Sequence, residues 1–575
     1  MSALYRDKAG SFKGRQSAGG ALFFPLQSAL MHLIVSILPI ALLVFLMTKK
    51  KSVPSKVALP AVALLTYFFS LIFLRQDPLR VNAAVIDGVL TALTPVTIIT
   101  GAIFLFKAME KTGALNVIRG WLNGVSSNKV AQLMIIGWAF AFLIEGASGF
   151  GTPAALAAPI LAGLGFNPLN AALFTLIMNS VPVSFGAVGT PTWFGFSGIA
   201  GLSSADILEI GFKTAVIHGI AACIIPVIGL LFILDFKQIR KNLGFIYISV
   251  AACVVPYVAA AVFNYEFPSL FGGFIGFLIS IVAAKLGWGL EKTAADAKVR
   301  TGGGTAVRGG LTGAAAVPRR YSFKVLVKAL FPLWGTLLIL IVTRVPTLGL
   351  KRFITLTEPE WLLRLGTLGT VSVSPALVLK LKNILGTSAA WDYSTLYVPG
   401  IIPFLLIAFV TFFLFRTKRN QIRETLKETA ERMEGPFKAL LGALVFVNLI
   451  MLGGERSPAM IIGTALAKGL GWGWEFFAPY LGALGSFFAG SNTVSNLTFG
   501  PIQDSIALNL GLNRTTVLAA QSVGGAMGNM VCINNIVAVC SVLGLSKAEG
   551  KILKKTVVPM IAYGIIAGAV TLLLF

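Results

Sequence analysis

Long runs of apolar residues, separated by short polar or basic segments, fill most of the chain. A helix needs about 20 apolar residues to cross the hydrocarbon core of a bilayer, and most of the runs approach or exceed that length. The pattern predicts an all-α polytopic membrane protein with about 12–14 transmembrane helices. The runs lie at about 21–47, 54–74, 84–107, 131–163, 168–200, 211–234, 244–263, 267–287, 324–343, 397–415, 437–453, 457–471, 475–509, 514–544 and 556–575.

Polar segments divide the chain into parts. Residues 1–20 form a polar N-terminal tail, and residues 288–323, which are rich in Gly, Ala and Arg, have the composition of a flexible basic linker. The linker separates a first membrane half, 21–287, from a second, 324–575. Within the second half, the less apolar stretch 344–396 is predicted to lie partly at the membrane interface.

Composition and charge support this prediction. Only 12% of the residues are charged, 56% are apolar and the mean hydropathy is +0.84, whereas soluble domains carry about 25% charged residues. A soluble enzyme is therefore excluded. The net charge of +25 comes from Lys and Arg between the apolar runs, as at 49–51 and 416–423, which is typical of cytoplasmic loops. We expect a multi-pass plasma-membrane protein that does not bind nucleic acid.

The two halves carry a weak internal repeat. Each has a polar, Gly-containing cluster after an apolar segment, beginning at Gly146 and at Gly490, and each continues through an LG(F/L)N turn to another apolar segment with a second Gly-rich break. We interpret the halves as two inverted repeats, each with a re-entrant hairpin and a broken helix. The predicted hairpins are 131–164 and 475–509, and the predicted broken helices are 168–200 and 514–544.

The breaks themselves predict a binding site. Gly149, Gly151 and Pro153 would end a helix inside the membrane, as would Gly186 and Gly189. Unpaired backbone groups in lipid cost several kcal/mol, so irregular backbone at that depth surrounds a cavity or is buried in protein. The N-terminal ends of half-helices carry free N–H groups and partial positive charge, which favour a carboxylate. We expect the site near the middle of the membrane.

Hydroxyl, amide and glycine residues at the breaks are the candidate substrate-binding residues. Such groups can bind a carboxylate and a neighbouring hydroxyl, or coordinate Na⁺ through their oxygens; the structural alternative is helix packing by small residues. In the first half the candidates are Ser148, Gly149, Gly151, Thr152, Asn179, Ser184, Gly186, Gly189 and Thr190. In the second half they are Ser491, Asn492, Thr493, Ser495, Asn496, Gln521, Asn529 and Asn534.

Glu145 is the candidate proton-coupling residue. It ends an apolar run and directly precedes the first Gly-rich break, and an ionisable residue within a span is a functional candidate by default. A proton that moves with a monoanion makes the net transfer neutral, so the membrane potential would not oppose uptake. The structural alternative is a carboxylate that accepts N–H bonds at the hairpin tip.

Other classes of protein remain open at this point. Residues 146–149 read Gly-Ala-Ser-Gly, the G-x-S-G of rhomboid intramembrane serine proteases, and His218 is the candidate base for Ser148. Polar re-entrant segments also build channel filters. The sequence contains no phosphate-binding loop of the kind that an ATP-driven pump needs. It also contains no His/Cys spacing typical of a metal site. We therefore expect no cofactor.

Four motifs cover the breaks: EGASGFGTP at 145–153, NSVPVSFGAVGTP at 179–191, GSNTVSN at 490–496 and GGAMGNM at 524–530. In these motifs the chain closely resembles the L-lactate permease family, which includes glycolate permeases. The resemblance implies secondary transport of L-lactate, D-lactate or glycolate by proton symport, in an elevator-type architecture similar to that of inverted-repeat ion transporters. Some members have Asp at the position of Asn492 and Lys at the position of Asn529, so Glu145 is the main ionisable group in the motifs of this chain.

The sequence therefore predicts a secondary transporter rather than an enzyme. The expected partners are a small-molecule carboxylate substrate and the lipid bilayer; a homo-oligomer stays open. The expected coupling ion is H⁺, and a Na⁺-coupled carboxylate symporter is the alternative.

Overall fold

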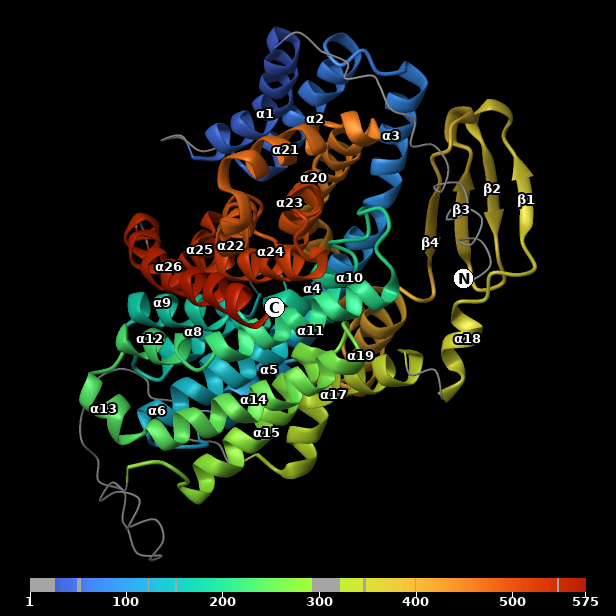
Figure 1. The fold of residues 1–575 in the computed structure, drawn as a ribbon. Coiled ribbons are helices and arrows are strands. Elements are labelled where there is room, and N and C mark those ends of the chain that lie inside the picture. Colours follow the sequence, from blue (N-terminus) through green and yellow to red (C-terminus); the bar gives the residue numbers. More distant parts are fainter. Residues whose placement is uncertain are drawn as a thin grey trace, which may run out of the picture.

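The computed structural model describes residues 26–48, 53–122, 124–149, 152–291, 321–344, 348–398, 400–545 and 548–575. The predicted N-terminal tail and most of the predicted linker lie outside the described residues. Helices dominate the fold (Figure 1). Those of the first half are α1 (Leu26–Thr48), α2 (Ser55–Ile72), α3 (Pro78–Thr91), α4 (Leu93–Lys111), α5 (Ala114–Leu122), α6 (Lys129–Leu133), the π-helical η1 (Met134–Phe140), α7 (Ala141–Ser148), α8 (Thr152–Gly163), α9 (Pro168–Met178), the 3-10 helix η2 (Val181–Phe185), α10 (Gly186–Trp193), α11 (Ser204–Ala221), α12 (Ile225–Leu231), α13 (Phe236–Lys241), α14 (Leu243–Phe263) and α15 (Pro268–Leu286).

The second half contains helices and one small sheet. Its α- and π-helices are α17 (Phe323–Arg344), α18 (Leu350–Ile354), the π-helical η6 (Gly400–Leu406), α19 (Ile407–Leu414), α20 (Arg419–Met451), α21 (Pro458–Leu470), α22 (Trp474–Ala489), α23 (Asn492–Leu510), α24 (Arg514–Gly528), α25 (Ile533–Leu543) and α26 (Glu549–Leu574). Short 3-10 turns are η4 (Gly366–Leu368), η5 (Ile384–Gly386), η7 (Gly454–Arg456), η8 (Gly471–Gly473) and η9 (Asn529–Val531).

Many of these helices are long and apolar enough to cross a membrane. By length and composition the described residues contain eight such helices, or up to ten if each of two bent helix pairs is one span. This confirms a polytopic helical membrane protein, although the count is below the predicted 12–14. The difference lies in four apolar helices that are too short to qualify, at 31–43, 56–72, 153–163 and 400–414.

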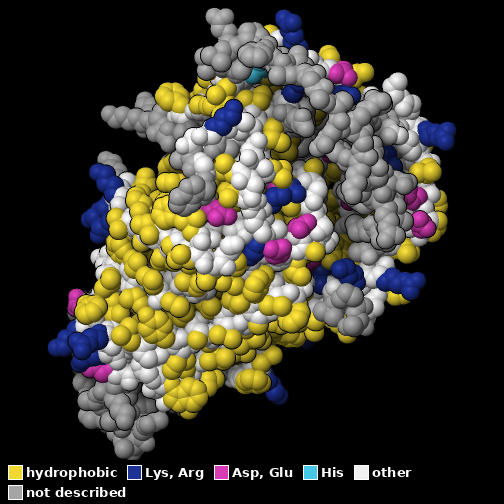
Figure 2. Space-filling view, in the orientation of Figure 1, with side chains coloured by type: hydrophobic (Ala, Val, Ile, Leu, Met, Phe, Trp, Pro, Cys, Tyr) yellow, Lys and Arg dark blue, Asp and Glu magenta, His cyan; other side chains and the backbone are white. Residues whose placement is uncertain are grey.

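The outer surface agrees with a lipid environment. In Figure 2, hydrophobic side chains cover a broad face of the molecule over α9, α12, α14 and α26. On α14, Val255 and Phe263 are 66% and 82% exposed, and on α26 Val558 is 64% exposed. An apolar face of this extent is typical of a surface that contacts lipid rather than water.

The helices break where glycine and proline cluster. In the first half, α7 ends at Gly149, which has a left-handed φ of +63°, and α8 packs back against α7 and η1. The arm 129–147 is itself long enough to span a bilayer. The chain then bends by 47° between α9 and the segment η2–α10.

The corresponding segments of the second half differ in their degree of bending. Gly490, with φ +71°, separates α22 from α23, and these two helices pack together as a hairpin. The 3-10 turn η9 interrupts the path from α24 to α25, but residues 514–540 still qualify as one continuous span.

A four-stranded antiparallel sheet departs from the predicted all-α fold. Its strands are β1 (Trp361–Arg364), β2 (Thr370–Val373), β3 (Val378–Lys382) and β4 (Trp391–Ser394), in the order β1-β2-β3-β4. The sheet lies beside the helical bundle, with β4 inward and β1 at the free edge (Figure 1). It falls within the stretch 344–396 that was expected to lie partly at the membrane interface.

Candidate functional site

The interrupted segments of both halves meet at one small cavity. Its walls come from the tip of the first hairpin, the break between α9 and α10, the tip of the second hairpin and the start of η9. The lining residues are Glu145, Gly149, Asn179, Val183, Gly186, Ala187, Pro191, Gly490, Ser491, Asn492, Thr493 and Asn529. Elements more than 300 residues apart in the sequence thus build a single site.

Glu145 provides the only ionisable side chain among these lining residues. It lies in the last turn of α7 and is 2% exposed. Asn179 Nδ2 donates a hydrogen bond of 3.1 Å to its Oε2. Its Oε1 lies against Gly186, where a Cβ atom would overlap with it. The amide of Asn179 therefore holds the carboxyl group in the cavity wall, and the missing side chain of Gly186 leaves room for it.

The start of α23 forms a donor-rich part of the cavity lining. Ser491 is its N-cap and accepts a bond of 3.4 Å from the backbone N–H of Val494. The first N–H groups of a helix have no acceptor within the helix, so those of Asn492 and Thr493 are available to a ligand. The helix dipole adds partial positive charge at this end. Neither Lys nor Arg is among the lining residues, so these backbone groups are the main attraction for an anion.

An unwound turn shapes the third wall. Ala187, Val188 and Gly189 have φ values of +44°, +59° and +68°, a left-handed conformation that is costly for residues with a Cβ. Two side chains satisfy carbonyls that the break frees: Thr190 Oγ1 donates to Ala187 O at 2.5 Å, and Trp193 Nε1 donates to Val188 O at 3.0 Å. Side chains of the turn thus pair two of the carbonyls that the break exposes.

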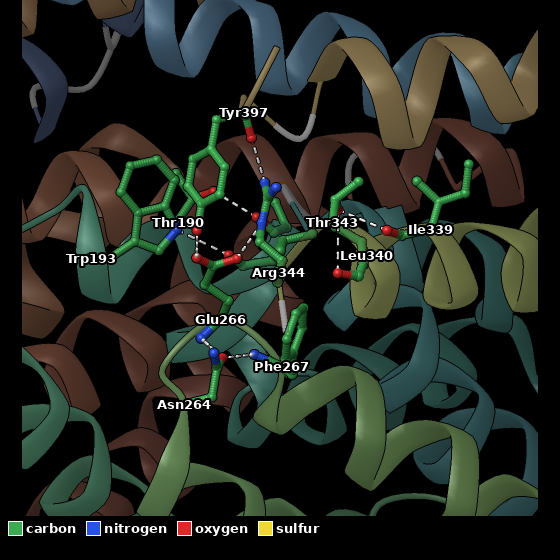
Figure 3. A network of polar contacts seen from close by, with 12 residues as sticks. Thr190, Trp193, Asn264, Glu266, Phe267, Ile339, Leu340, Thr343, Arg344 and Tyr397 are labelled. Atoms are coloured by element: carbon green, nitrogen blue, oxygen red, sulfur yellow. Dashed lines mark hydrogen bonds and ion pairs between the residues drawn. The ribbon is translucent and has the colours of Figure 1, made fainter. Parts of the chain in front are cut away.

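The buried ion pair of Arg344 and Glu266 packs against this turn (Figure 3). Arg344, at the end of α17, donates to Glu266 Oε2 at 2.6 Å and to the carbonyl of Tyr397 at 2.6 Å, and its guanidinium lies 3.9 Å from the Tyr397 ring centroid. Tyr397 also donates to Glu266 Oε1 at 3.1 Å. Gly189 packs so closely on the backbone of Glu266 that a Cβ there would overlap with it.

A polar chain connects the two broken helices next to the cavity. Ser184 Oγ lies 3.0 Å from Ser522 Oγ and 2.9 Å from His218 Nε2. The other ring nitrogen of His218 lies 2.5 Å from the hydroxyl of Tyr563 in α26. Asn492 Nδ2 donates to Ser522 O at 3.1 Å and so joins the second hairpin tip to the same chain.

This arrangement bears on the protease interpretation. A catalytic base needs a ring nitrogen within hydrogen-bond distance of the nucleophile. Both nitrogens of His218 are occupied by Ser184 and Tyr563, which leaves neither for Ser148. The side chain of Ser148 itself is outside the described residues.

The predicted site residues divide into three groups. Those that line the cavity are Glu145, Gly149, Asn179, Gly186, Ser491, Asn492, Thr493 and Asn529. Those with described positions outside the lining are Ser184, Gly189, Thr190, Ser495, Asn496, Gln521 and Asn534. Gly151 and the side chains of Ser148 and Thr152 lie outside the described residues.

The second group has other partners. Ser495 Oγ donates to Gly482 O at 2.7 Å, and Asn496 Nδ2 donates to Pro191 O at 2.9 Å. Gln521 Nε2 donates to Ser495 Oγ at 3.1 Å. These side chains tie hairpin and broken helices together, which is the packing role that was the structural alternative. Sequence reasoning missed the apolar lining residues Val183, Ala187 and Pro191, for which their position inside the break is the only signal.

Two lining side chains carry an unpaired polar atom. Asn179 Oδ1 and Asn492 Oδ1 are buried and have no hydrogen-bond partner. Within the described part of the chain no group of three or more His, Cys, Asp and Glu residues could hold a metal ion. The cavity therefore combines one carboxyl group, amide oxygens and backbone N–H donors. This combination suits a small anion that also carries a hydrogen-bond donor.

Comparison with known proteins gives a consistent result. The family model described as L-lactate permease matches residues 32–575. A "Putative L-lactate permease" of Haemophilus influenzae is 50% identical, with 94% of this chain and 97% of that protein covered. The L-lactate permease of Bacillus subtilis is 28% identical over 82% of this chain and 83% of its own. The glycolate permease of Escherichia coli is 27% identical over 89% of this chain and 90% of its own.

Solved structures show only a distant similarity. The efflux pump MtrF of Neisseria gonorrhoeae is 14% identical with a TM-score of 0.41, and 95% of this chain and 94% of that one are covered. The YdaH transporter of Alcanivorax borkumensis is 15% identical with a TM-score of 0.41, and 94% of this chain and 98% of that one are covered.

Proposed function

Because the chain belongs to the L-lactate permease family, we propose that it transports small 2-hydroxy monocarboxylates, namely L-lactate, D-lactate and glycolate, across the plasma membrane by proton symport. Permeases are transporters and not enzymes, and the long apolar helices agree with a multi-pass membrane protein. Relatives named L-lactate permease and glycolate permease support this class of substrate.

One observation carries the proposal: four interrupted helical segments meet at a single small cavity with one carboxyl group. The substrate carboxylate would lie at the N-terminal end of α23, where Asn492 and Thr493 offer free N–H groups. Preorganised backbone donors of this kind bind small anions without a cationic side chain. Alternating access would then move this site between the two sides of the membrane.

Glu145 is the proposed proton carrier. Burial of a carboxylate charge costs several kcal/mol unless the charge is paired, and the only bond from a described side chain to Glu145 is that of Asn179. A carboxylate and a substrate anion in the same cavity would repel each other. Protonation of Glu145 removes this repulsion, so the binding of substrate and proton would be coupled.

Na⁺ coupling is the alternative that the site chemistry also allows. The unpaired oxygens of Asn179 and Asn492 are hard ligands of the type that Na⁺ prefers. The two schemes differ in the ion gradient that drives uptake, because one proton or one Na⁺ that moves with one monoanion leaves the net charge unchanged. Na⁺ coupling would make lactate uptake depend on a Na⁺ gradient and persist without a pH gradient.

Uptake by purified protein in liposomes tests the proposal. We expect labelled lactate to accumulate when the interior is alkaline, and to do so equally with and without an imposed membrane potential. A protonophore should abolish accumulation, and protein-free liposomes give the background. Uptake that ignores the pH gradient and requires Na⁺ would overturn proton symport, and absence of lactate uptake under every gradient would overturn the substrate class.

A further inference from the structure

One wall of the cavity presents an acceptor that lacks a donor. Asn179 is 4% exposed, its Nδ2 is committed to Glu145, and its Oδ1 has no partner. A buried amide oxygen without a donor costs about 1–3 kcal/mol, so native structures rarely leave one without a purpose. In either protonation state Glu145 keeps an oxygen that accepts from Nδ2, and this bond directs Oδ1 away from the carboxyl group.

Another part of the cavity lining presents donors that have no acceptor within their own helix. These are the first backbone N–H groups of α23, at Asn492 and Thr493, which line the same cavity. A ligand that satisfies both walls must carry an anionic group and a hydrogen-bond donor within a few bonds of each other. A 2-hydroxy carboxylate has this combination, because its hydroxyl lies on the carbon next to the carboxylate.

We propose that Asn179 Oδ1 accepts the hydrogen bond of the substrate 2-hydroxyl, and that Asn179 thereby selects 2-hydroxy acids over acids of similar size without that hydroxyl. The proposal rests on the proposed function, since it assigns the two ends of the carboxylate substrate to the two walls. The substrate methyl group of lactate would then lie against the apolar lining residues Val183 and Ala187.

Two analogues separate this arrangement from simple anion binding. Propionate has the size and charge of lactate but no hydroxyl, so it leaves Oδ1 unpaired. Pyruvate has a carbonyl in place of the hydroxyl. Its carbonyl oxygen and Asn179 Oδ1 are both acceptors, so they cannot form a hydrogen bond with each other. Sites built to pair a substrate hydroxyl discriminate strongly against analogues that lack it. Glycolate keeps the hydroxyl and loses only the methyl group, so it should compete nearly as well as lactate.

The experiment measures competition with labelled lactate in proteoliposomes under lactate–lactate exchange, which needs no net proton movement. In the wild-type protein we expect propionate and pyruvate to need at least a tenfold higher concentration than lactate or glycolate for half-inhibition. In Asn179→Ala the difference between lactate and propionate should fall below threefold. Asn170→Ala is the matched control, because Asn170 lies in the same helix α9 away from the cavity, and it should keep the wild-type ratio.

Each result decides one question. Propionate that competes as well as lactate in the wild type overturns the role of Asn179 even if Asn179→Ala fails to fold. A full tenfold ratio in a folded Asn179→Ala protein overturns it as well. If the wild-type protein exchanges no lactate at all, the proposed function itself is wrong, and this failure is distinct from exchange without discrimination.

Discussion

Glu145 shows how single residues set the chemistry of the cavity. Its carboxyl group lies between Asn179, which donates one hydrogen bond, and Gly186, whose lack of a side chain leaves room for Oε1. Among the described lining residues, neither Lys nor Arg accompanies it. The neighbourhood therefore provides little compensation for a fixed negative charge, and a proton or a cation from solution would have to supply the rest.

The substitution Glu145→Gln tests this residue directly. Glutamine keeps the shape and can pair with Asn179, but it cannot exchange a proton. We expect proton-driven lactate accumulation in proteoliposomes to fall to the background level, while lactate–lactate exchange is retained in part. Glu434→Gln is the control, because Glu434 is an exposed acid that pairs with Lys438, and it should transport normally. Normal accumulation by Glu145→Gln would remove Glu145 from the coupling mechanism.

Sequence reasoning predicts which residue types lie at the helix breaks better than it predicts which way their side chains face. Glu145, Asn179 and Asn492 were predicted from their position at the breaks, and all three line the cavity. Ser184 and Asn496 have the same chemistry and the same kind of position, yet their side chains bond to neighbouring helices. The side of a break that a side chain faces depends on the backbone turn, here the left-handed residues 187–189, which no local pattern specifies.

At the scale of elements, glycine and proline mark most of the helix ends around the site. Gly149 and Gly490 adopt positive φ values at the hairpin tips, as the clusters there suggested. The sheet was not predicted, because strands of four or five residues are too short for a clear alternation of apolar and polar positions. Strand β1 is exposed along its whole length, so it lacks the apolar-in, polar-out signal altogether.

The ion pair of Arg344 and Glu266 links elements that are distant in sequence. Removal of one partner leaves the other charge buried, which costs about 3–5 kcal/mol, and Glu266 packs directly on the unwound turn at Gly189. We expect Arg344→Ala to lower the melting temperature of the detergent-purified protein by several degrees and to abolish most lactate transport. The measurements are thermal unfolding and liposome uptake.

Two further variants make this prediction specific. The double variant Glu266→Gln with Arg344→Met removes both charges and should recover part of the lost stability. Lys241→Ala breaks an exposed ion pair, in which the side chain of Lys241 is 46% exposed and that of Glu291 is 37% exposed. Exposed ion pairs contribute about 0–1 kcal/mol to stability. Equal losses in Arg344→Ala and Lys241→Ala would contradict a supporting role for the buried pair.

At the scale of the whole molecule, α4 connects two chemically different faces. Near its start, Thr97 Oγ1 accepts a bond of 2.9 Å from Tyr393 in the sheet. At its end, Lys111 pairs with Glu424 and Glu428 in the charged first part of α20, at 3.1 and 2.7 Å. A helical rise of 1.5 Å per residue places Thr97 and Lys111 about 20 Å apart, which is most of the thickness of the hydrocarbon core.

This geometry predicts the orientation of the protein. The basic segments 288–323 and 416–436 belong on the cytoplasmic side by the positive-inside rule, so the sheet, at the other end of α4, should face the outside. The test starts from Cys223→Ser, because Cys223 is the exposed cysteine among the four, and adds Leu362→Cys in β1 or Arg423→Cys in α20. A membrane-impermeant maleimide should label Leu362→Cys in intact cells and Arg423→Cys only after permeabilisation. The reverse pattern would invert the orientation, whereas labelling of both from the same side would contradict the placement of the sheet and the charged part of α20 on opposite faces.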